Sequence, residues 1–280
     1  MNDDYLLRFA GIGRLYGTAA LQAFANAHVC VIGIGGVGSW AAEALARSGI
    51  GAITLVDLDD ICISNTNRQI HALTATVGQD KVDVMAERIL QINPACQVSK
   101  IDDFVAVENL FEIFATTFSY VIDCIDSIKA KTALIAHCKR NKIPLVTIGG
   151  AGGQLDPTQI ELTDLAKTVN DPLLAKVRNN LRRDYNYSRN VKRSFGIDAV
   201  YSTEQLRYPK PDGTVCNAKQ SSDGAMRLDC SGGFGAVTVV TGSFAFVAVS
   251  RVLKKLADKA DKADKADKAE KLPSEDKAPV

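Results

Sequence analysis

Residues 33–39 read Gly-Ile-Gly-Gly-Val-Gly-Ser, and they directly follow an apolar run at 27–32. A strand that runs into a glycine-rich turn and then a helix is suited to phosphate, because glycines let the backbone approach the ligand closely. The N-terminus of the helix adds unpaired N–H groups and the positive end of the helix dipole. The turn therefore predicts a bound nucleotide without saying which one.

The simplest interpretation of this turn is a dinucleotide site. Gly33, Gly35 and Gly38 satisfy the G-x-G-x-x-G fingerprint, and Asp57 ends the next apolar run, where it would accept hydrogen bonds from ribose hydroxyls. On these residues alone, an NAD-dependent oxidoreductase is the default hypothesis.

Further residues in and after the glycine turn favour chemistry at phosphorus over hydride transfer. They are Gly36 and Ser39 within the turn and Asp59, Asn65, Asn67, Arg68, Gln69 and Lys81 after it. Attack on a phosphorus atom moves negative charge among phosphate oxygens, and nearby cations stabilise that charge. Arg68 or Lys81 alone could be an ordinary surface cation, but the two together favour a triphosphate.

Asp126 is a candidate ligand for a metal ion. It ends a later apolar run, in the sequence Asp-Cys-Ile-Asp-Ser at 123–127. The carboxyl ends of the strands in a doubly wound sheet share one edge, which would place Asp126 near the glycine turn. A carboxylate there could hold Mg²⁺. The alternative is that Asp126 caps the helix that follows.

Alternating apolar runs and helical patterns predict the elements that position these residues. We expect strands at 27–32, 52–56, 120–124 and 145–148 and helices at 38–48, 81–92 and 129–140. This alternation predicts an α/β fold, with a Rossmann-like doubly wound, mostly parallel sheet and helices on both faces.

A basic segment lies within about residues 173–210. Its residues 173–193 contain Lys176, Arg178, Arg182, Arg183, Arg189, Lys192 and Arg193, against the single acid Asp184. We expect contacts with RNA phosphates from Arg182, Arg183, Arg189, Lys192 and Arg193, with Tyr185 and Tyr187 available to stack on bases. The alternative is a solvated helix and loop.

The C-terminal part contains an uncharged run and a charged tail. Residues 231–250 are long enough to span a bilayer, but they are rich in small and hydroxylated residues and contain no Leu or Ile. We therefore prefer a buried helix packed against the sheet to a membrane span or a peripheral attachment. Residues 257–280 include an Ala-Asp-Lys repeat and predict a solvated low-complexity tail, either a frayed helix or disordered.

The bulk composition narrows the class of protein. The net charge of +1 means that the protein as a whole is not a polyanion binder. The seven cysteines include no C-x-x-C pair, which argues against a disulfide framework and a four-thiolate zinc site. The acidic N-terminus has no apolar signal core, so we expect a reduced, cytoplasmic location.

Together these motifs resemble the ubiquitin-activating superfamily of ATP-dependent adenylating enzymes, which includes the thiamine and molybdopterin sulfur-carrier activators. The similar stretches are the glycine turn, 56–59, 64–69, 77–82 and 123–127, within roughly residues 8–253. The resemblance implies that Asp57 binds the ribose, that Arg68 and Lys81 bind ATP phosphates, and that Asp126 binds Mg²⁺. It implies an ATP-binding domain over residues 1–256 whose nucleotide ligands are Gly33, Gly35, Gly36, Gly38, Ser39, Asp57, Asp59, Asn67, Arg68, Lys81 and Asp126.

A closer resemblance is to one branch, the tRNA threonylcarbamoyladenosine dehydratases. It depends on Arg8-Phe9 and on the stretches 14–17, 67–72, 149–154 and 229–235. The branch closes the threonyl carboxylate of a modified adenosine in the tRNA anticodon loop onto a urea-like nitrogen, with loss of water. ATP would activate the carboxylate as an acyl-adenylate or an acyl-phosphate, and both stay open. The superfamily's zinc-binding C-x-x-C pairs are missing here, so no structural zinc is expected.

The superfamily also implies a homodimer in which an N-terminal arginine reaches the ATP site of the neighbouring subunit. Arg14 is our first candidate for this arginine and Arg8 the second. The expected catalytic set is therefore Arg68, Lys81, Arg14 and Cys230. Cys230 or Cys216 would carry an acyl group or sulfur, with a cysteine desulfurase or sulfur acceptor as a partner. The alternative is that Cys230 is a buried structural cysteine.

Three other functions remain as alternatives. The first is an adenylating activator of a small sulfur-carrier protein, or a component of a sulfur relay. The others are the NAD-dependent oxidoreductase and a nucleotide-binding scaffold without catalysis.

Overall fold

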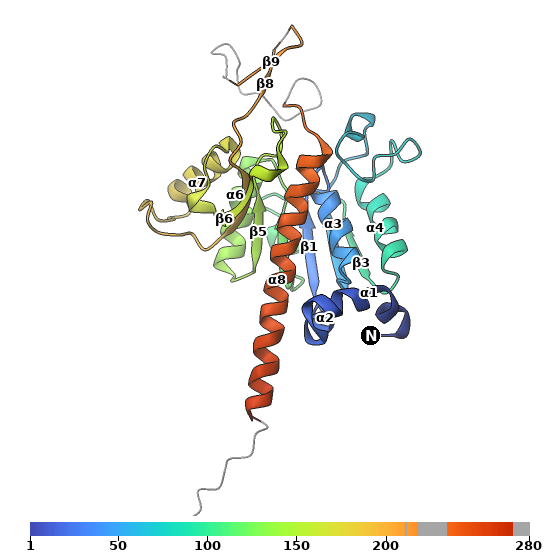
Figure 1. The fold of residues 1–280 in the computed structure, drawn as a ribbon. Coiled ribbons are helices and arrows are strands. Elements are labelled where there is room, and N and C mark those ends of the chain that lie inside the picture. The colour runs from blue at the N-terminus through green and yellow to red at the C-terminus, as the bar shows by residue number, and fades with distance from the viewer. Residues whose placement is uncertain (211, 218–233, 271–280) are drawn as a thin grey trace, which may run out of the picture.

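The computed structural model describes residues 1–210, 212–217 and 234–270, and its centre is a seven-stranded sheet (Figure 1). The strands are β1 (His28–Ile32), β2 (Ala52–Val56), β3 (Gln97–Ile101), β4 (Tyr120–Asp123), β5 (Leu145–Ile148), β6 (Ile160–Asp164) and β7 (Asp198–Ser202). Their order is β3-β2-β1-β4-β5-β7-β6, and only β6 runs antiparallel to its neighbour. A separate pair, β8 (Tyr208–Pro209) and β9 (Val215–Cys216), projects from one end of the molecule (Figure 1).

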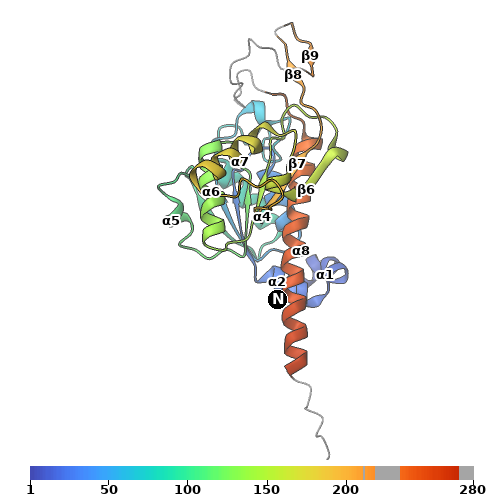
Figure 2. The same cartoon turned by 90° about the vertical axis from the view of Figure 1, so that its left-hand side faces the viewer.

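Helices cover both faces of the sheet (Figure 2). They are α1 (Asp3–Tyr16), α2 (Thr18–Ala25), α3 (Gly38–Arg47), α4 (Lys81–Ile92), α5 (Leu110–Ile113), α6 (Ile128–Arg140), α7 (Pro172–Asp184) and α8 (Thr238–Glu270). Residues of α3, α4 and α8 pack on one face, and residues of α5, α6 and α7 pack on the other.

The two cores follow from the alternation of side chains along each central strand. Val29 and Val31 of β1 are buried with α3, α4 and α8, whereas Cys30 and Ile32 of the same strand are buried with α6 and α7. Successive residues of a strand point to opposite faces, so a strand that is apolar throughout is covered on both sides. This explains why β1 reads as a continuous apolar run.

The predicted doubly wound, mostly parallel sheet with helices on both faces is confirmed. The predicted elements 52–56, 81–92 and 145–148 agree with β2, α4 and β5 at both ends. The elements α1, α2, α5, β3, β6, β7, β8 and β9 were not predicted from the sequence. The strands β3 and β6 lie at the two edges of the sheet and are largely exposed, so they lack the apolar runs of the central strands.

The uncharged run at 231–250 contributes the first part of α8, which begins at Thr238; residues 231–233 lie outside the described part of the chain. Val240 and Phe244 are buried in the core, so the prediction of a buried helix is correct for the residues that the structure describes. Within those residues, no helix combines the length and the apolar character needed to cross a membrane.

The helix α8 continues through the Ala-Asp-Lys repeat as far as Glu270. Its second half extends past the sheet at the end where α2 lies (Figures 1 and 2). Leu256 and Ala257 are still buried, so the packed part of the helix reaches into the beginning of the repeat.

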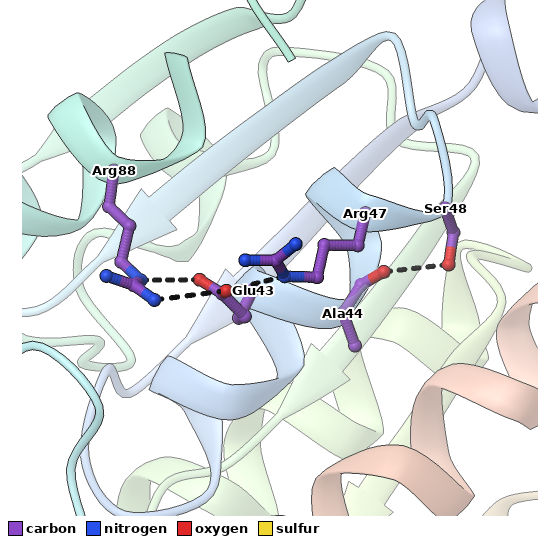
Figure 3. Close-up of polar contacts among 5 residues, drawn as sticks. All are labelled: Glu43, Ala44, Arg47, Ser48 and Arg88. Atoms are coloured by element: carbon purple, nitrogen blue, oxygen red, sulfur yellow. Dashed lines mark hydrogen bonds and ion pairs between the residues drawn. The ribbon is translucent and has the colours of Figure 1, made fainter. Parts of the chain in front are cut away.

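A buried carboxylate joins α3 to α4 (Figure 3). Glu43 of α3 accepts hydrogen bonds from Arg88 of α4, at 2.6 Å from Nε and 3.2 Å from Nη2, and from Nε of Arg47 at 2.7 Å. The helix α3 begins at the glycine turn and α4 begins at Lys81. We call this contact the Glu43 clasp; it fixes the two helices that begin at the candidate site.

Candidate functional site

The predicted nucleotide residues gather at the carboxyl edge of the parallel strands. The chain passes from β1 to β2 and β3 on one side of the sheet, and later to β4, β5 and β7 on the other. The carboxyl ends of β1 and β4 therefore flank a topological switch point, where ligands bind in open α/β sheets.

The glycine turn between β1 and α3 is too tight for side chains at two of its positions. Gly33 has a φ of 86°, and a Cβ there would lie 3.1 Å from the backbone carbonyl of Cys124. A Cβ on Gly38 would lie 1.8 Å from the carbonyl oxygen of Gly33. The N-cap of α3, Val37, makes no side-chain capping bond, so the first turn of this helix can donate to an anion.

Asp57 lies directly beneath the glycine turn. The backbone N–H of Ile34 donates to Oδ2 of Asp57 at 2.6 Å, and the N–H of Asp59 donates to Oδ1 at 2.9 Å. The ammonium of Lys81 lies 3.6 Å from Oδ1 of Asp57 and 2.7 Å from Oδ2 of Asp59. Lys81 is 5% exposed, which rules out the alternative that it is an ordinary surface cation.

Arg68 lies against the glycine turn at Gly36. A Cβ on Gly36 would lie 3.2 Å from Cδ of Arg68, so the glycine makes room for this side chain. Nη1 of Arg68 donates to the carbonyl of Ser64 and to Oδ1 of Asn67, both at 2.9 Å. The indole N–H of Trp40 in α3 donates to the carbonyl of Arg68 at 3.0 Å, which ties the segment to the helix that begins at the turn.

Asn67 connects this segment to the start of α8. Its Nδ2 donates to the carbonyl of Ala236 at 2.8 Å, and the hydroxyl of Thr238 donates to its backbone carbonyl at 2.6 Å. Residues far apart in the sequence therefore hold the arginine segment in place.

Two buried polar atoms near the turn lack a protein partner. Within the described part of the chain, Oγ of Ser39 and Oε1 of Gln69 make no hydrogen bond. Buried polar groups are nearly always paired, so such atoms at a phosphate-type turn indicate an external partner. Together with the two cations and the uncapped helix, they fit a polyphosphate.

His71 is a buried residue that the sequence analysis did not single out. Both of its ring nitrogens lack partners among the described residues. Burial lowers the pKa of His71 to about 4, with a further contribution from the positive charges of Lys81 and Arg88. The ring is therefore neutral at physiological pH and adds no charge to the site.

Asp126 is exposed on the loop that follows β4, and this loop lies against the glycine turn through the contact of Gly33 with Cys124. The N-cap of α6 is Ser127, so the alternative role of Asp126 as the cap of this helix is wrong. Among the residues that the structure describes, no group of three or more acidic, His or Cys side chains is arranged to hold a metal ion.

The loop that holds Asp126 rests on a buried ion pair that the sequence analysis missed. Nζ of Lys131 lies 2.9 Å from Oδ1 of Asp123, and both side chains are 0% exposed. Asp123 also accepts from the N–H of Ile125 at 3.1 Å and from the hydroxyl of Thr147 at 2.7 Å. Two features of the sequence could have indicated this ion pair. Asp123 ends an apolar strand, and Lys131 lies among the buried positions of a helix.

The N-terminal arginines do not reach the nucleotide site of their own chain. The helix α1 packs at the other end of α3, where the hydroxyl of Tyr5 donates to the carbonyl of Gly49 at 2.6 Å. Arg14, in the last turn of α1, is exposed there, and Arg8 pairs with Asp4 at 2.8 Å. Figure 1 shows α1 and α2 at the end of the molecule opposite β8 and β9.

The basic segment is also separated from the glycine turn. The N-cap of α7, Asp171, accepts from the N–H of Gly150 at 2.9 Å at the carboxyl edge, so α7 begins there. Arg182 and Arg183 lie in its last turn, about 16 Å along a helix of 13 residues. Arg189, Lys192 and Arg193 are exposed in the loop that follows.

The two arginines at the end of α7 already have local partners. The guanidinium of Arg182 lies 5.4 Å from the ring centroid of Phe195, and its Nε donates to the carbonyl of Ser188 at 3.3 Å. Arg183 pairs with Asp184 at 2.7 Å on the surface. Cys216 lies in β9, and Cys230 lies outside the described residues.

The fold and this site define the class of protein, which is an α/β nucleotide-binding protein whose glycine turn and two cations are arranged for a polyphosphate. The sequence model of the ThiF family matches residues 10–273, and the chain belongs to this family.

Its similarity to known proteins extends over nearly the whole chain. The chain is 61% identical to the tRNA threonylcarbamoyladenosine dehydratase of Escherichia coli over 259 residues, which cover 92% of this chain and 97% of that protein. The Haemophilus influenzae protein of the same name is 54% identical, with 92% and 96% covered. The crystal structure of the E. coli dehydratase in complex with ATP superposes with a TM-score of 0.83 at 57% identity, covering 93% of this chain and 98% of that one.

Proposed function

We propose that this chain is an enzyme that uses ATP to dehydrate threonylcarbamoyladenosine in tRNA. The reaction closes the threonyl carboxylate onto a urea-like nitrogen of the same nucleoside, so that one carboxylate oxygen is lost. The observation that carries this proposal is the approach of Arg68 and Lys81 to the glycine turn, in a chain that matches the E. coli dehydratase over 97% of its length.

The residues of the site have separate tasks in this reaction. A carboxylate is a poor electrophile, and ATP supplies the group that makes one of its oxygens a good leaving group. The N–H groups at the start of α3 would face the phosphates, while Arg68 and Lys81 neutralise the charge that develops on them. Asp57 would accept hydrogen bonds from the ribose, and Asp126 would hold Mg²⁺ against the phosphates.

Ring closure itself needs little help from the protein. The attacking nitrogen and the carboxyl carbon belong to one substrate, and well-oriented intramolecular reactions have effective molarities of roughly 10⁵ M or more. A thiol is therefore not required for this step. A role for Cys230 or Cys216 as an acyl or sulfur carrier, with a desulfurase or sulfur acceptor as partner, stays a separate hypothesis.

The remaining partners follow from the same proposal. The cations at 182–193, of which Arg183, Arg189, Lys192 and Arg193 are exposed, would contact tRNA phosphates near the modified loop. A second copy of the chain would supply Arg14, because this residue lies at the far end of α3 from the glycine turn of its own chain. We expect such an enzyme to work in the reduced cytoplasm.

The test is direct. The protein is incubated with ATP, Mg²⁺ and tRNA that carries threonylcarbamoyladenosine, and the nucleosides are analysed by mass spectrometry. The modified nucleoside should lose the mass of one water only when ATP is present. An unchanged nucleoside while ATP is consumed would overturn the proposal and would favour an adenylating activator of a carrier protein.

A further inference from the structure

A large groove opens at the edge of the sheet opposite the glycine turn. It has a volume of about 1060 Å³, and its floor is formed by the first residues of β4, β5 and β7. One wall is the second half of α8, and the other is the end of α6. We call it the basal groove; its charged lining residues are Lys139, Lys142, Asp164, Asp198, Arg251, Lys255 and Lys259.

The acidic residues of the basal groove are occupied by internal partners. Asp198 forms a two-point ion pair with Arg251, at 2.7 and 2.9 Å, and the hydroxyl of Tyr120 donates to it at 3.3 Å. Asp164 accepts backbone N–H bonds from Ala166, Phe195 and Gly196 at 2.7 to 2.9 Å. These internal contacts account for Asp164, Asp198 and Arg251, which therefore have a structural role in the groove.

The lysines of the groove lack such partners. The side chains of Lys142, Lys255 and Lys259 make no ion pair or hydrogen bond with any residue that the structure describes, and the side chain of Lys139 reaches only the carbonyl of Gly196 at 3.5 Å. All four side chains are exposed. The end of α6 favours nearby cations through the helix dipole, which accounts in part for Lys139 and Lys142 but not for the lysines of α8.

The pair on α8 is informative because of its spacing. Lys255 and Lys259 are four residues apart on the groove side of the helix, and like charges at this spacing repel. Outside the groove, the same helix pairs Lys254 with Asp258, at 3.3 Å. Lys254 is thus neutralised outside the groove, whereas Lys255 and Lys259 are not neutralised within it.

We infer that the basal groove binds the phosphate backbone of tRNA at a distance from the reacting nucleoside. Lysines on two facing walls present mobile point charges, which suit successive phosphates and carry no sequence information. The five residues of β1 span about 16 Å between this end of the sheet and the nucleotide edge, so one long RNA can reach both. The inference rests on the proposed function, because it takes tRNA as the polyanion.

The test compares two double variants of the same helix. Lys255→Ala/Lys259→Ala removes the groove pair, and Lys254→Ala/Lys262→Ala removes two lysines of α8 that do not line the groove. We expect the groove variant to bind full-length tRNA on the order of tenfold more weakly at moderate salt. The slope of log affinity against log salt should fall by roughly 1.4 to 1.8, as expected for two lost phosphate contacts. The control variant should bind tRNA nearly as the wild type does.

Further measurements make the result specific. Affinity for ATP should be the same in both variants, and their difference in RNA binding should disappear with an isolated anticodon stem-loop too short to reach the groove.

Equal tRNA affinity of the two variants would overturn the inference and leave the groove to an acidic protein partner. A changed molecular mass of the groove variant in sedimentation would also overturn it, in favour of an interface between copies. Failure of the proposed function would be detected separately, in the dehydration assay, where the wild-type protein would leave threonylcarbamoyladenosine in tRNA unchanged.

Discussion

At the scale of single residues, the two cations of the site are held in different ways. Lys81 is buried beside Asp57 and Asp59, so its ammonium is fixed and its charge is largely balanced. Arg68 is only half-buried, and two oxygens of its own segment hold one of its nitrogens. In the proposed reaction, Lys81 would therefore set the position of the phosphates, and Arg68 would respond to the charge that develops on them.

Removing either cation should strongly reduce turnover and leave the fold intact. For Arg68→Ala we expect a loss of roughly 10² to 10³ in kcat, the usual effect of deleting one group that stabilises transition-state charge. Lys81→Ala should lose at least as much and should also weaken ATP binding. Single-turnover dehydration of modified tRNA measures the first effect, and calorimetry with ATP measures the second. Arg140→Ala, an exposed cation at the end of α6, is the control, and near-normal turnover of Arg68→Ala would remove it from the mechanism.

His71 should make the stability of the protein depend on pH. Its pKa is about 4 in the folded state and near 6.5 when unfolded, so the unfolded chain takes up the proton first as the pH falls. The stabilisation is complete above about pH 6.5 and is lost progressively down to pH 4. Between pH 7.5 and 5, the free energy of unfolding of the wild type should fall by about 2 kcal/mol more than that of His71→Gln. Urea denaturation at the two pH values measures this difference, and parallel changes in both proteins would contradict the assignment.

At the scale of elements, the site depends on the relative placement of α3 and α4. The Glu43 clasp joins them through a carboxylate that is 5% exposed and accepts from two arginines (Figure 3). Hydrogen bonds to buried charged groups are worth more than neutral ones, so Glu43→Gln should lower the free energy of unfolding by about 2 kcal/mol. Glu87→Gln, at an exposed position of α4, should change it by less than about 0.5 kcal/mol. Denaturant unfolding of both variants tests the clasp, and equal stabilities would show that the two helices do not depend on it.

Elements with a strong apolar pattern could be predicted from the sequence, and the others could not. The strand β2 and the helix α4 were predicted at both ends, because β2 is a continuous apolar run and the buried positions of α4 recur with the period of a helix. The edge strand β6 reads Ile-Glu-Leu-Thr-Asp and has no fully buried residue, so its pairing with β7 is a tertiary effect. The glycine turn was predicted from local sequence, since its geometry excludes side chains at Gly33 and Gly38.

The supporting polar residues were harder to predict. Asp123 and Lys131 are eight positions apart and form an ion pair only because β4 and α6 pack together. Glu43 and Arg88 likewise come from two helices that meet in the fold. Such ion pairs do not recur with any period in the sequence. A single sequence therefore indicates the residues that face the ligand more readily than the ion pairs that support those residues.

At the scale of the whole molecule, the nucleotide edge and the N-terminal helices lie at opposite ends of the sheet (Figure 1). The helix α1 exposes Leu7 and Leu15, at 83% and 76%, and α8 exposes Val239 and Phe246. Exposed apolar side chains on helices are common at interfaces between subunits. They support the proposal of a homodimer in which α1 of one subunit approaches the nucleotide edge of the other.

Mixing two inactive variants tests this arrangement. Arg14→Ala removes the arginine that a subunit would donate, and Arg68→Ala damages the site that would receive the partner's arginine. Each variant alone should be inactive in dehydrating tRNA. After equal amounts exchange subunits, half of the dimers are mixed, and one of the two sites in each mixed dimer has both native arginines. Activity should therefore return to about one quarter of the wild-type value per site.

Exchange is verified by mass spectrometry with one variant labelled by heavy isotopes. Complete exchange without recovery would show that Arg14 does not act across the interface, and the same mixture with Arg8→Ala would then test the second candidate.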